Sequence, residues 1–431
     1  MNQTYGQLIR GNRNFRCLLF GQYISELGNW FNFIAGLGLI RSITGGSPVA
    51  AALLLVCRTL PYSAFSPIAG TFVDRLSRRR VMIVTDILRS IVALAFIFVQ
   101  NPEDLKLAYL ASVLISFFSA FFEGAKNSAT PNITGREGLL AGTALMFSSR
   151  FVLMAVGAAF GGLATAVFSY RVSFIINSVS FLVSAYSIWL IPEEATREQV
   201  KRNGGKTDFM TELKEGIGFA FGNHFAMTIL ILNVFWALGG GAINIIYDQL
   251  GGVYFAQRLS WQSDTIVAFF LISAGLGLFV GIMLAHRIGG FLERRKITRK
   301  FIGWSLILSG GLFALAGYLP NIWVIFFLVF ISRAIIGLEY SIQETMFQRS
   351  LPDYIRGRIL TIDRGAEIFV FSLSSLVAGF SLEIISPQLL MVLSGLFSGT
   401  AGILWFIRMR RGDPADREKP VSDLFAEDSS G

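Results

Sequence analysis

The stretch Gly70-Thr-Phe-Val-Asp74-Arg75-Leu-Ser-Arg78-Arg79-Arg80 is a short, strongly basic break between two long apolar blocks. About twelve such blocks of roughly 20 residues follow one another along the chain, each long enough to cross a bilayer. Hydrophobic residues make up 53% of the 431 residues and charged residues only 15%, well below the charged share of soluble domains. The pattern predicts a polytopic, all-helical membrane protein.

The apolar blocks predict the bounds of the membrane-spanning helices. These are 16–41, 49–73, 80–100, 106–128, 138–167, 171–191, 224–247, 263–285, 300–319, 321–347, 358–384 and 388–409. After the polar stretch 193–208, apolar residues at helical spacing predict an amphipathic surface helix, or alternatively the polar start of the seventh span. The expected units are an N-terminal bundle 1–192, a cytoplasmic linker 193–223, a C-terminal bundle 224–411 and a disordered tail 412–431.

Lysine and arginine residues are unevenly shared between the breaks. One alternate set of breaks is rich in them, with 75–80 and 294–300 as the densest runs. The other set holds only Arg41, Lys106, Arg171 and Arg258. The positive-inside rule places the basic side in the cytoplasm, so we expect a multi-pass protein of the plasma (inner) membrane with both termini cytoplasmic. The net charge of +9 reflects this loop bias rather than nucleic-acid binding.

The two halves of the chain carry related segments. The basic motif after the second span has a counterpart after the eighth, at 281–287. Glu123 stands eight residues before Pro131, and Glu344 stands eight residues before Pro352, at equivalent ends of spans four and ten. Parallel repeats of six spans are typical of a transporter architecture with a central cavity. The fold expected is therefore twelve transmembrane helices in two six-helix bundles related by a pseudo-repeat.

These motifs resemble the major facilitator superfamily over nearly the whole chain. The family signature between spans two and three is G-x-L-x-D-R-x-G-R-R, and the matching residues are Gly70, Asp74, Arg75, Arg78 and Arg79. The segments 25–31, 44–48, 79–89 and 352–358 look like the macrolide-efflux and enterobactin-exporter branch. That resemblance implies proton-driven export of amphipathic or bulky organic solutes. Two features depart from proton-coupled exporters: span five lacks the proline of Gly-Pro-x-x-Gly-Gly, and span four lacks an internal arginine.

The signature loop is expected to act as a cytoplasmic gate. Asp74 would accept hydrogen bonds from the N-terminal end of a neighbouring helix. Arg75, Arg78 and Arg79 would form ion pairs across the seam between the halves, which would hold an outward-open state. The alternative interpretation is that these charges only set the topology.

Charged residues inside the spans mark a second candidate site, since each is costly unless it is paired or hydrated. They are Glu26, Arg58, Arg150, Arg333 and Glu367. At ~1.5 Å per residue they lie about 14 Å or more from the cytoplasmic ends of their spans, where a midplane cavity is expected. We predict that Glu26 pairs with Arg150 or Arg58 in one state and is protonated in the other. Glu367 is the second candidate proton carrier, and a static ion pair is the alternative for both.

The sequence predicts a secondary transporter that works by alternating access. It contains no phosphate-binding Gly-x-x-x-x-Gly-Lys motif and no catalytic constellation, so no enzyme activity, cofactor or metal site is expected. The expected partners are a small-molecule substrate, protons and the lipid bilayer, and the protein is expected to be monomeric. The alternatives are a lysophospholipid flippase or an uptake symporter or facilitator of the same fold. A membrane receptor or channel is the alternative from another class.

Overall fold

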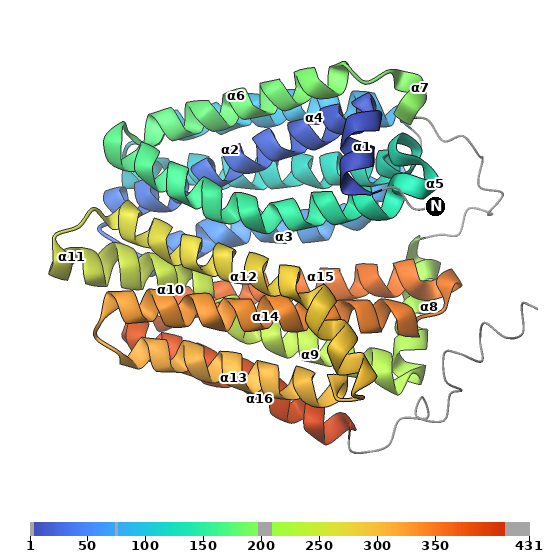
Figure 1. Cartoon of the computed structure of the whole chain (residues 1–431). Helices are drawn as coiled ribbons and strands as arrows, with labels where there is room; N and C mark the ends of the chain where they lie inside the picture. The colour runs from blue at the N-terminus through green and yellow to red at the C-terminus, as the bar shows by residue number, and fades with distance from the viewer. Residues whose placement is uncertain (1–3, 74–75, 197–208, 410–431) are drawn as a thin grey trace, which may run out of the picture.

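The computed structural model describes residues 4–73, 76–196 and 209–409, and within these ranges every regular element is a helix. Most helices run along one common direction and form two groups, one on either side of the molecule (Figure 1). The N-terminal group contains α1 (Tyr5–Gly11), α2 (Arg13–Thr44), α3 (Pro48–Val73), α4 (Arg78–Ala93), η1 (Leu94–Phe98), η2 (Pro102–Asp104), α5 (Leu105–Val167), α6 (Tyr170–Trp189) and α7 (Glu193–Thr196).

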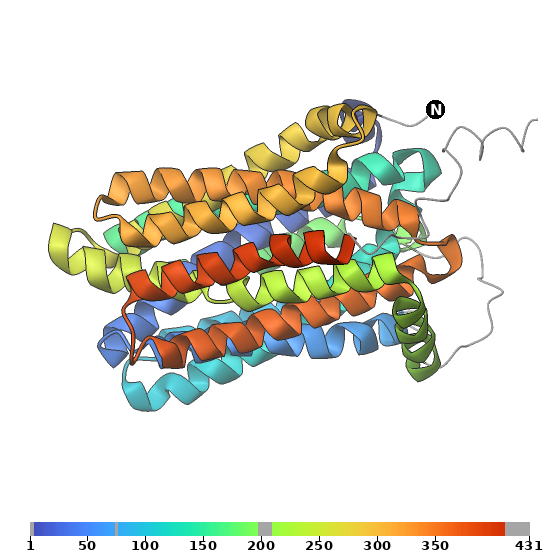
Figure 2. The same ribbon diagram turned by 90° about the horizontal axis from the view of Figure 1, so that it is seen from below.

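The long helices of the C-terminal group run along the same common direction (Figure 1). It contains α8 (Phe209–Gly222), α9 (His224–Gly240), α10 (Ile243–Gln249), the π-helical η3 (Leu250–Phe255), α11 (Ala256–Leu259), α12 (Ser263–Arg294), α13 (Thr298–Tyr318), α14 (Ile322–Ser350), α15 (Asp353–Ser381) and α16 (Pro387–Met409). Helix α8, at the position of the predicted surface helix, lies across the ends of the long helices (Figure 2). We call the end that carries α1 and α8 the basic end, and the end that carries α11 the distal end.

One long helix accounts for two predicted spans. Helix α5 covers both 106–128 and 138–167, and it is interrupted at Gly135, whose φ of 67° and ψ of 174° are not helical. A residue with a side chain is strained in that conformation, whereas glycine adopts it readily. The kink at Gly135 therefore lets the chain turn at the basic end and begin a new helix.

Nine helical segments among the described residues are long and apolar enough to cross a membrane. Helices α2 and α15 and the second part of α5 are not among them, although each coincides with a predicted span. Helices α2 and α15 carry charged residues within their length, including Glu26 and Arg41 in α2 and Asp363 and Glu367 in α15. Charges inside long helices of a membrane protein face protein or water rather than lipid.

Among the described residues, the buried apolar side chains that join the two groups form a cluster at the distal end. That cluster includes Phe33 and Leu54 from the N-terminal group and Tyr247 and Phe270 from the C-terminal group. Toward the basic end each group has a cluster of its own. These separate clusters are represented by Phe15, Met82 and Phe122 in the N-terminal group and by Phe225, Phe347 and Trp405 in the C-terminal group. The two groups therefore pack together at the distal end and separate toward the basic end.

Helices α12 and α14 approach too closely to accept a side chain at Gly281. A Cβ atom there would lie 2.0 Å from the carbonyl oxygen of Ala334 and 2.7 Å from the backbone nitrogen of Leu338. We expect Gly281→Ala to destabilise the protein by about 1–3 kcal/mol, because overpacking forces two backbones apart. Gly290→Ala is the matched control on the same helix, since no atom lies within 4 Å of its Cβ position. Thermal unfolding in detergent checks this prediction, and equal midpoints for the two variants would contradict it.

Candidate functional site

A buried ion network joins the two groups at the distal end. Arg41, in the last turn of α2, donates to Asp248 of α10 and to Asp264 of α12 through its two terminal guanidinium nitrogens. The three side chains are buried, with Asp248 completely inaccessible to solvent. Gln249 donates to the second carboxylate oxygen of Asp248 at 2.9 Å. We call Arg41, Asp248 and Asp264 the distal latch, because the forked guanidinium binds both carboxylates at once.

Two glycines make room for the distal latch. A Cβ atom at Gly252, in the π-helical turn η3, would lie 2.3 Å from the Nη1 atom of Arg41. A Cβ atom at Gly38 of α2 would lie 2.5 Å from the Oδ1 atom of Asp264. A larger residue at either position would displace the charged groups of the distal latch. The closed distal end therefore requires the close approach of the backbone at both glycines.

The seam between the groups continues from the distal latch toward the middle of the molecule. The hydroxyl groups of Thr59 on α3 and Ser372 on α15 are hydrogen-bonded at 2.7 Å. One turn further along, the Ser63 hydroxyl donates to the carbonyl oxygen of Gly365 at 3.2 Å. These contacts bring α3 and α15 together at mid-length, so the seam is polar as well as apolar.

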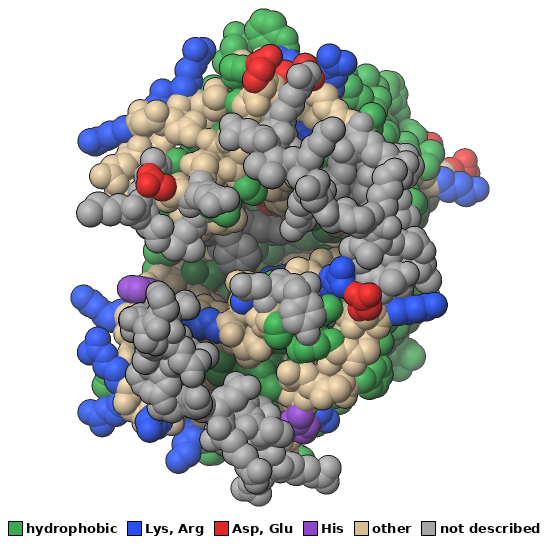
Figure 3. Space-filling model, turned by 90° about the vertical axis from the view of Figure 1, so that its right-hand side faces the viewer, with side chains coloured by type: hydrophobic (Ala, Val, Ile, Leu, Met, Phe, Trp, Pro, Cys, Tyr) green, Lys and Arg blue, Asp and Glu red, His purple; other side chains and the backbone are tan. Residues whose placement is uncertain are grey.

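The basic end has a different surface. Figure 3 shows this face hollowed between the part formed by the N-terminal group and the part formed by the C-terminal group, with Lys and Arg side chains around the hollow. The apolar clusters, which are shared at the distal end but separate toward the basic end, agree with this view. We call the hollow the basic-end cleft. The molecule is therefore closed at the distal end and open at the basic end.

The predicted charges inside the spans occupy different environments. Arg58 donates to the Asn32 side chain at 3.2 Å and to the Asn29 carbonyl at 3.0 Å, which joins α3 to α2 within the N-terminal group. Glu26 is half-buried on α2. The side chain of Arg150 lies outside what the structure describes, so the pairing of Glu26 with Arg150 or Arg58 stays a prediction.

The two predicted charges of the C-terminal group are also separate from each other. Arg333 is buried in α14, with its guanidinium 4.7 Å from the centre of the Phe313 ring. Glu367 accepts a hydrogen bond at 2.8 Å from Arg364, one turn earlier on α15. That local ion pair is the alternative interpretation given above for Glu367. The proton-carrying role of Glu367 stays a prediction.

The signature loop is described only in part. Asp74 and Arg75 lie outside the described residues, and Gly70 is placed only as part of the α3 backbone. Arg78 donates to the Ser128 carbonyl at 3.0 Å, and Arg79 donates to the Trp189 carbonyl. Both acceptors belong to the N-terminal group. In a state that is open at the basic end these two arginines thus stabilise their own group, and their role as a gate across the seam stays a prediction.

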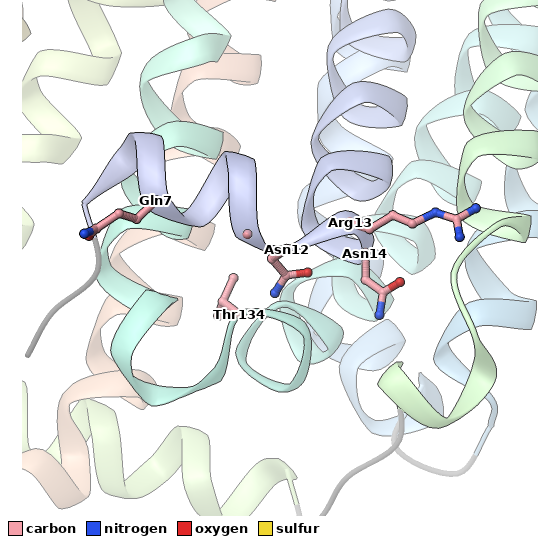
Figure 4. Close-up of a pocket in the computed structure, with 6 residues that line it drawn as sticks. Gln7, Asn12, Arg13, Asn14 and Thr134 are labelled. Carbon is pink, nitrogen blue, oxygen red and sulfur yellow. The ribbon is translucent and has the colours of Figure 1, made fainter.

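A polar pocket of about 360 Å³ lies at the corner between α1 and α2 (Figure 4). Asn12 caps α2 by accepting from the Phe15 backbone nitrogen at 2.9 Å, and its amide donates to the Ile133 carbonyl of α5 at 2.6 Å. Leu8 of α1 is fully buried in the N-terminal cluster. These contacts dock α1 onto α5. The pocket therefore belongs to a helix-docking corner rather than to the seam between the groups.

The distal latch and two buried carboxylates of the C-terminal group, Glu339 and Asp363, are not among the site residues predicted from the sequence. The positive-inside rule treats Arg41 as a loop charge, yet it is 8% exposed and paired with two carboxylates. Asp264, Glu339 and Asp363 all lie within the predicted spans. The rule that selected Glu26, a charge inside an apolar span, would have found these three carboxylates as well.

The family assignment rests on the profile of the Major Facilitator Superfamily, which matches residues 18–297. The putative bacilysin exporter BacE of Bacillus subtilis (strain 168) is 25% identical over 397 residues, which cover 90% of this chain and 93% of BacE. Macrolide efflux protein A of Streptococcus pyogenes is 23% identical over 370 residues, which cover 84% of each chain. These relatives confirm the resemblance to efflux proteins.

A solved structure confirms the fold independently. The crystal structure of a bacterial homologue of the human lysosomal transporter Spinster matches with a TM-score of 0.71 at 15% identity, over 95% of this chain and 99% of that one. The fold, the family profile and the efflux relatives agree with one another. This chain therefore belongs to the Major Facilitator Superfamily, and it is a multi-pass membrane transporter rather than an enzyme.

Proposed function

We propose that this protein is a proton-coupled exporter that moves amphipathic or bulky organic solutes by alternating access. The observation that carries the proposal is the asymmetry of the seam, with the distal latch closed and the basic-end cleft open. The positive-inside rule makes the basic end cytoplasmic. An exporter collects its substrate in a state that is open to the cytoplasm, and relatives of this chain carry names of efflux proteins.

The proposed architecture is twelve spans in two six-helix bundles, with α5 supplying two of the spans. The bundles are 1–192 and 224–411, joined by a cytoplasmic linker, 193–223. Residues 197–208 of the linker and the whole tail, 412–431, lie outside the described residues. Both termini would be cytoplasmic in the plasma membrane. Rocking of one bundle against the other would open the distal end and close the basic-end cleft, and the protein would work as a monomer.

The charged residues inside the spans would couple this rocking motion to the movement of protons across the membrane. Glu26 is the proposed carrier in the N-terminal bundle, with Arg58 and Arg150 as its partners. Arg333 and Glu367 would line the cavity from the C-terminal bundle. When the distal end opens, the signature-loop residues would form the cytoplasmic gate. Those residues are Gly70, Asp74, Arg75, Arg78 and Arg79.

Proteoliposomes with an imposed pH gradient test the proposal. The compounds offered are ethidium, erythromycin, enterobactin and a fluorescent lysophospholipid, and proton movement is followed with a pH-sensitive dye. We expect wild-type protein to move one of the first three compounds against proton flow, and Glu26→Gln to lose the dependence on the gradient. Glu103→Gln, an exposed residue at the distal end, is the matched control.

Other outcomes of the same assay separate the rival functions. Compound movement that does not depend on the pH gradient would indicate a facilitator rather than a proton-coupled exporter. Movement of the lysophospholipid alone would indicate a lipid flippase. If Glu26→Gln still moves the compound in response to the gradient, Glu26 is not the proton carrier, and the protein is still a proton-coupled exporter.

A further inference from the structure

A buried polar cluster lies inside the C-terminal group, away from the distal latch. The amide nitrogen of Asn233 on α9 donates to both carboxylate oxygens of Asp363 on α15, at 3.0 and 2.9 Å. The amide nitrogen of Gln343 on α14 donates to the Asn233 side-chain oxygen at 2.8 Å. All three side chains are buried, with Asp363 only 3% exposed. We call Asn233, Gln343 and Asp363 the carboxamide cluster, because the amide of Asn233 bonds the carboxyl group and is itself bonded by the amide of Gln343.

A second buried carboxyl group lies beside this cluster on α14. Glu339 stands one helical turn before Gln343 and is 3% exposed. Its Oε1 atom is buried without a hydrogen-bond partner among the described residues. Residues four apart lie on the same face of a helix, so Glu339 and Gln343 share one face of α14. Apart from the carboxylates of the distal latch, the C-terminal group thus contains two further buried carboxyl groups, Asp363 and Glu339.

Neither carboxyl group is paired with a cation among the described residues. The charged groups that interact electrostatically with Asp363 among the described residues are the carboxylates Glu344 and Glu367, of which Glu367 is paired with Arg364. Several charged and titratable groups on the neighbouring helices have partners of their own. Among these are Glu215 of α8 with Arg358, His224 of α9 with the Arg408 carbonyl, Asp248 of α10 with Arg41, Arg58 of α3 with α2, and Tyr340 of α14 beneath Arg364. An ionised carboxylate is costly in such a place, whereas a protonated carboxyl group avoids that cost.

The position of Asp363 connects it to the seam between the groups. Two residues later on α15, the carbonyl of Gly365 accepts from Ser63 of α3. Further along the same helix, Ser372 is bonded to Thr59. A shift of α15 against α9 would separate Asp363 from Asn233 and let water reach the carboxyl group. Such a shift would also disturb the contacts of α15 with α3, so the charge on Asp363 and the geometry of the seam are mechanically linked.

We propose that Asp363, held by the carboxamide cluster, binds the transported proton in the C-terminal group. The proton is bound in the state described here, and it passes to water when α15 moves and the site becomes hydrated. The inference rests on the proposed proton-coupled export and gives it a site. It also divides the coupling between the groups, with Glu26 as the candidate in the other bundle.

The first test is infrared difference spectroscopy on the purified full chain, titrated from acid to alkaline pH. A protonated carboxyl group gives a carbonyl-stretch band that a carboxylate does not. Near neutral pH, where an exposed carboxyl group such as Glu103 is ionised, we expect Asp363→Asn to lose one component of this band and Asp363→Glu to restore a component at a shifted position. Glu103→Gln should keep the wild-type band at that pH. An unchanged band in Asp363→Asn would overturn the proposal. Size-exclusion chromatography shows whether each variant is folded.

The second test uses ethidium, erythromycin and enterobactin in proteoliposomes. For each compound that wild type moves, gradient-driven transport by Asp363→Asn should fall to the level of empty liposomes, while exchange of the compound across the membrane without a gradient continues. Gradient-driven transport that persists in Asp363→Asn would overturn the coupling role and leave the exporter standing. If wild type moves none of the three, proton-coupled export fails, and the infrared test still decides whether Asp363 binds a proton.

Discussion

Arg41→Ala should shift the protein from the state open at the basic end to a state open at the distal end. The substitution leaves Asp248 and Asp264 buried together without the cation that binds both. Removing one partner of a buried ion pair costs about 3–5 kcal/mol, because a buried charge is left uncompensated. Opening the distal end would hydrate both carboxylates and remove this cost. The population of the distal-open state should therefore rise by roughly 10²-fold or more.

A cysteine reporter on the seam measures this shift. Ser372 is 1% exposed and bonded across the seam to Thr59, and cysteine is close to serine in size. With Cys17 and Cys57 replaced by serine, Ser372→Cys should react slowly with a membrane-impermeant maleimide added from the outside. Adding Arg41→Ala should accelerate the labelling strongly, and Ser42→Ala, at the neighbouring exposed position, should leave it slow. Equal labelling rates in the presence and absence of Arg41→Ala would contradict the role of the distal latch.

Gly162→Leu should abolish transport by blocking the closure of the distal end. A Cβ atom at Gly162 of α5 would lie 2.5 Å from the Ala268 Cβ atom and 3.3 Å from the Asp264 carbonyl oxygen, both on α12. A leucine therefore cannot fit while the two groups are packed together there. The protein can relieve the overlap by remaining open at the distal end, so we expect a folded variant whose transport rate falls to background.

The control for this variant is Gly311→Leu, since no atom lies within 4 Å of the Cβ position of Gly311. Compound movement in proteoliposomes and the labelling of Ser372→Cys are measured together. Gly162→Leu should combine lost transport with fast labelling, whereas Gly311→Leu should resemble wild type in both. A Gly162→Leu variant that transports normally with a protected cysteine would contradict this prediction, because it would show that the leucine does not keep the distal end open.

The helices were predictable from the sequence because their signal is local. Runs of apolar residues define the helices to within a few residues, as for the span predicted at 49–73 and the helix α3 observed at Pro48–Val73. The kink at Gly135 separates two predicted spans, although its backbone conformation could not be read from the sequence. A helix is observed at Phe209–Gly222, where the amphipathic spacing after the linker predicts one.

The distal latch was not predictable, because its partners are distant in sequence. Arg41 is separated from Asp248 by 207 residues and from Asp264 by 223. A count of positive charges treats Arg41 as one more loop residue, and only the packing of the two groups brings the carboxylates to it. Asp363 could have been selected as a charge inside a span. Its lack of a described cation partner, and its hydrogen bonds to Asn233, depend on the tertiary structure.

Distances between spin labels at the two ends of the molecule test alternating access most directly. One pair of labels joins exposed residues of the two groups at the distal end, Glu103 and Glu383, and a second pair joins Leu76 and Lys300 at the basic end. In bilayers we predict that Arg41→Ala lengthens the distal distance and shortens the basic distance relative to the otherwise unchanged protein. Two distances that stay constant, or that change in the same direction, would contradict the rocking of two groups around a closed distal latch.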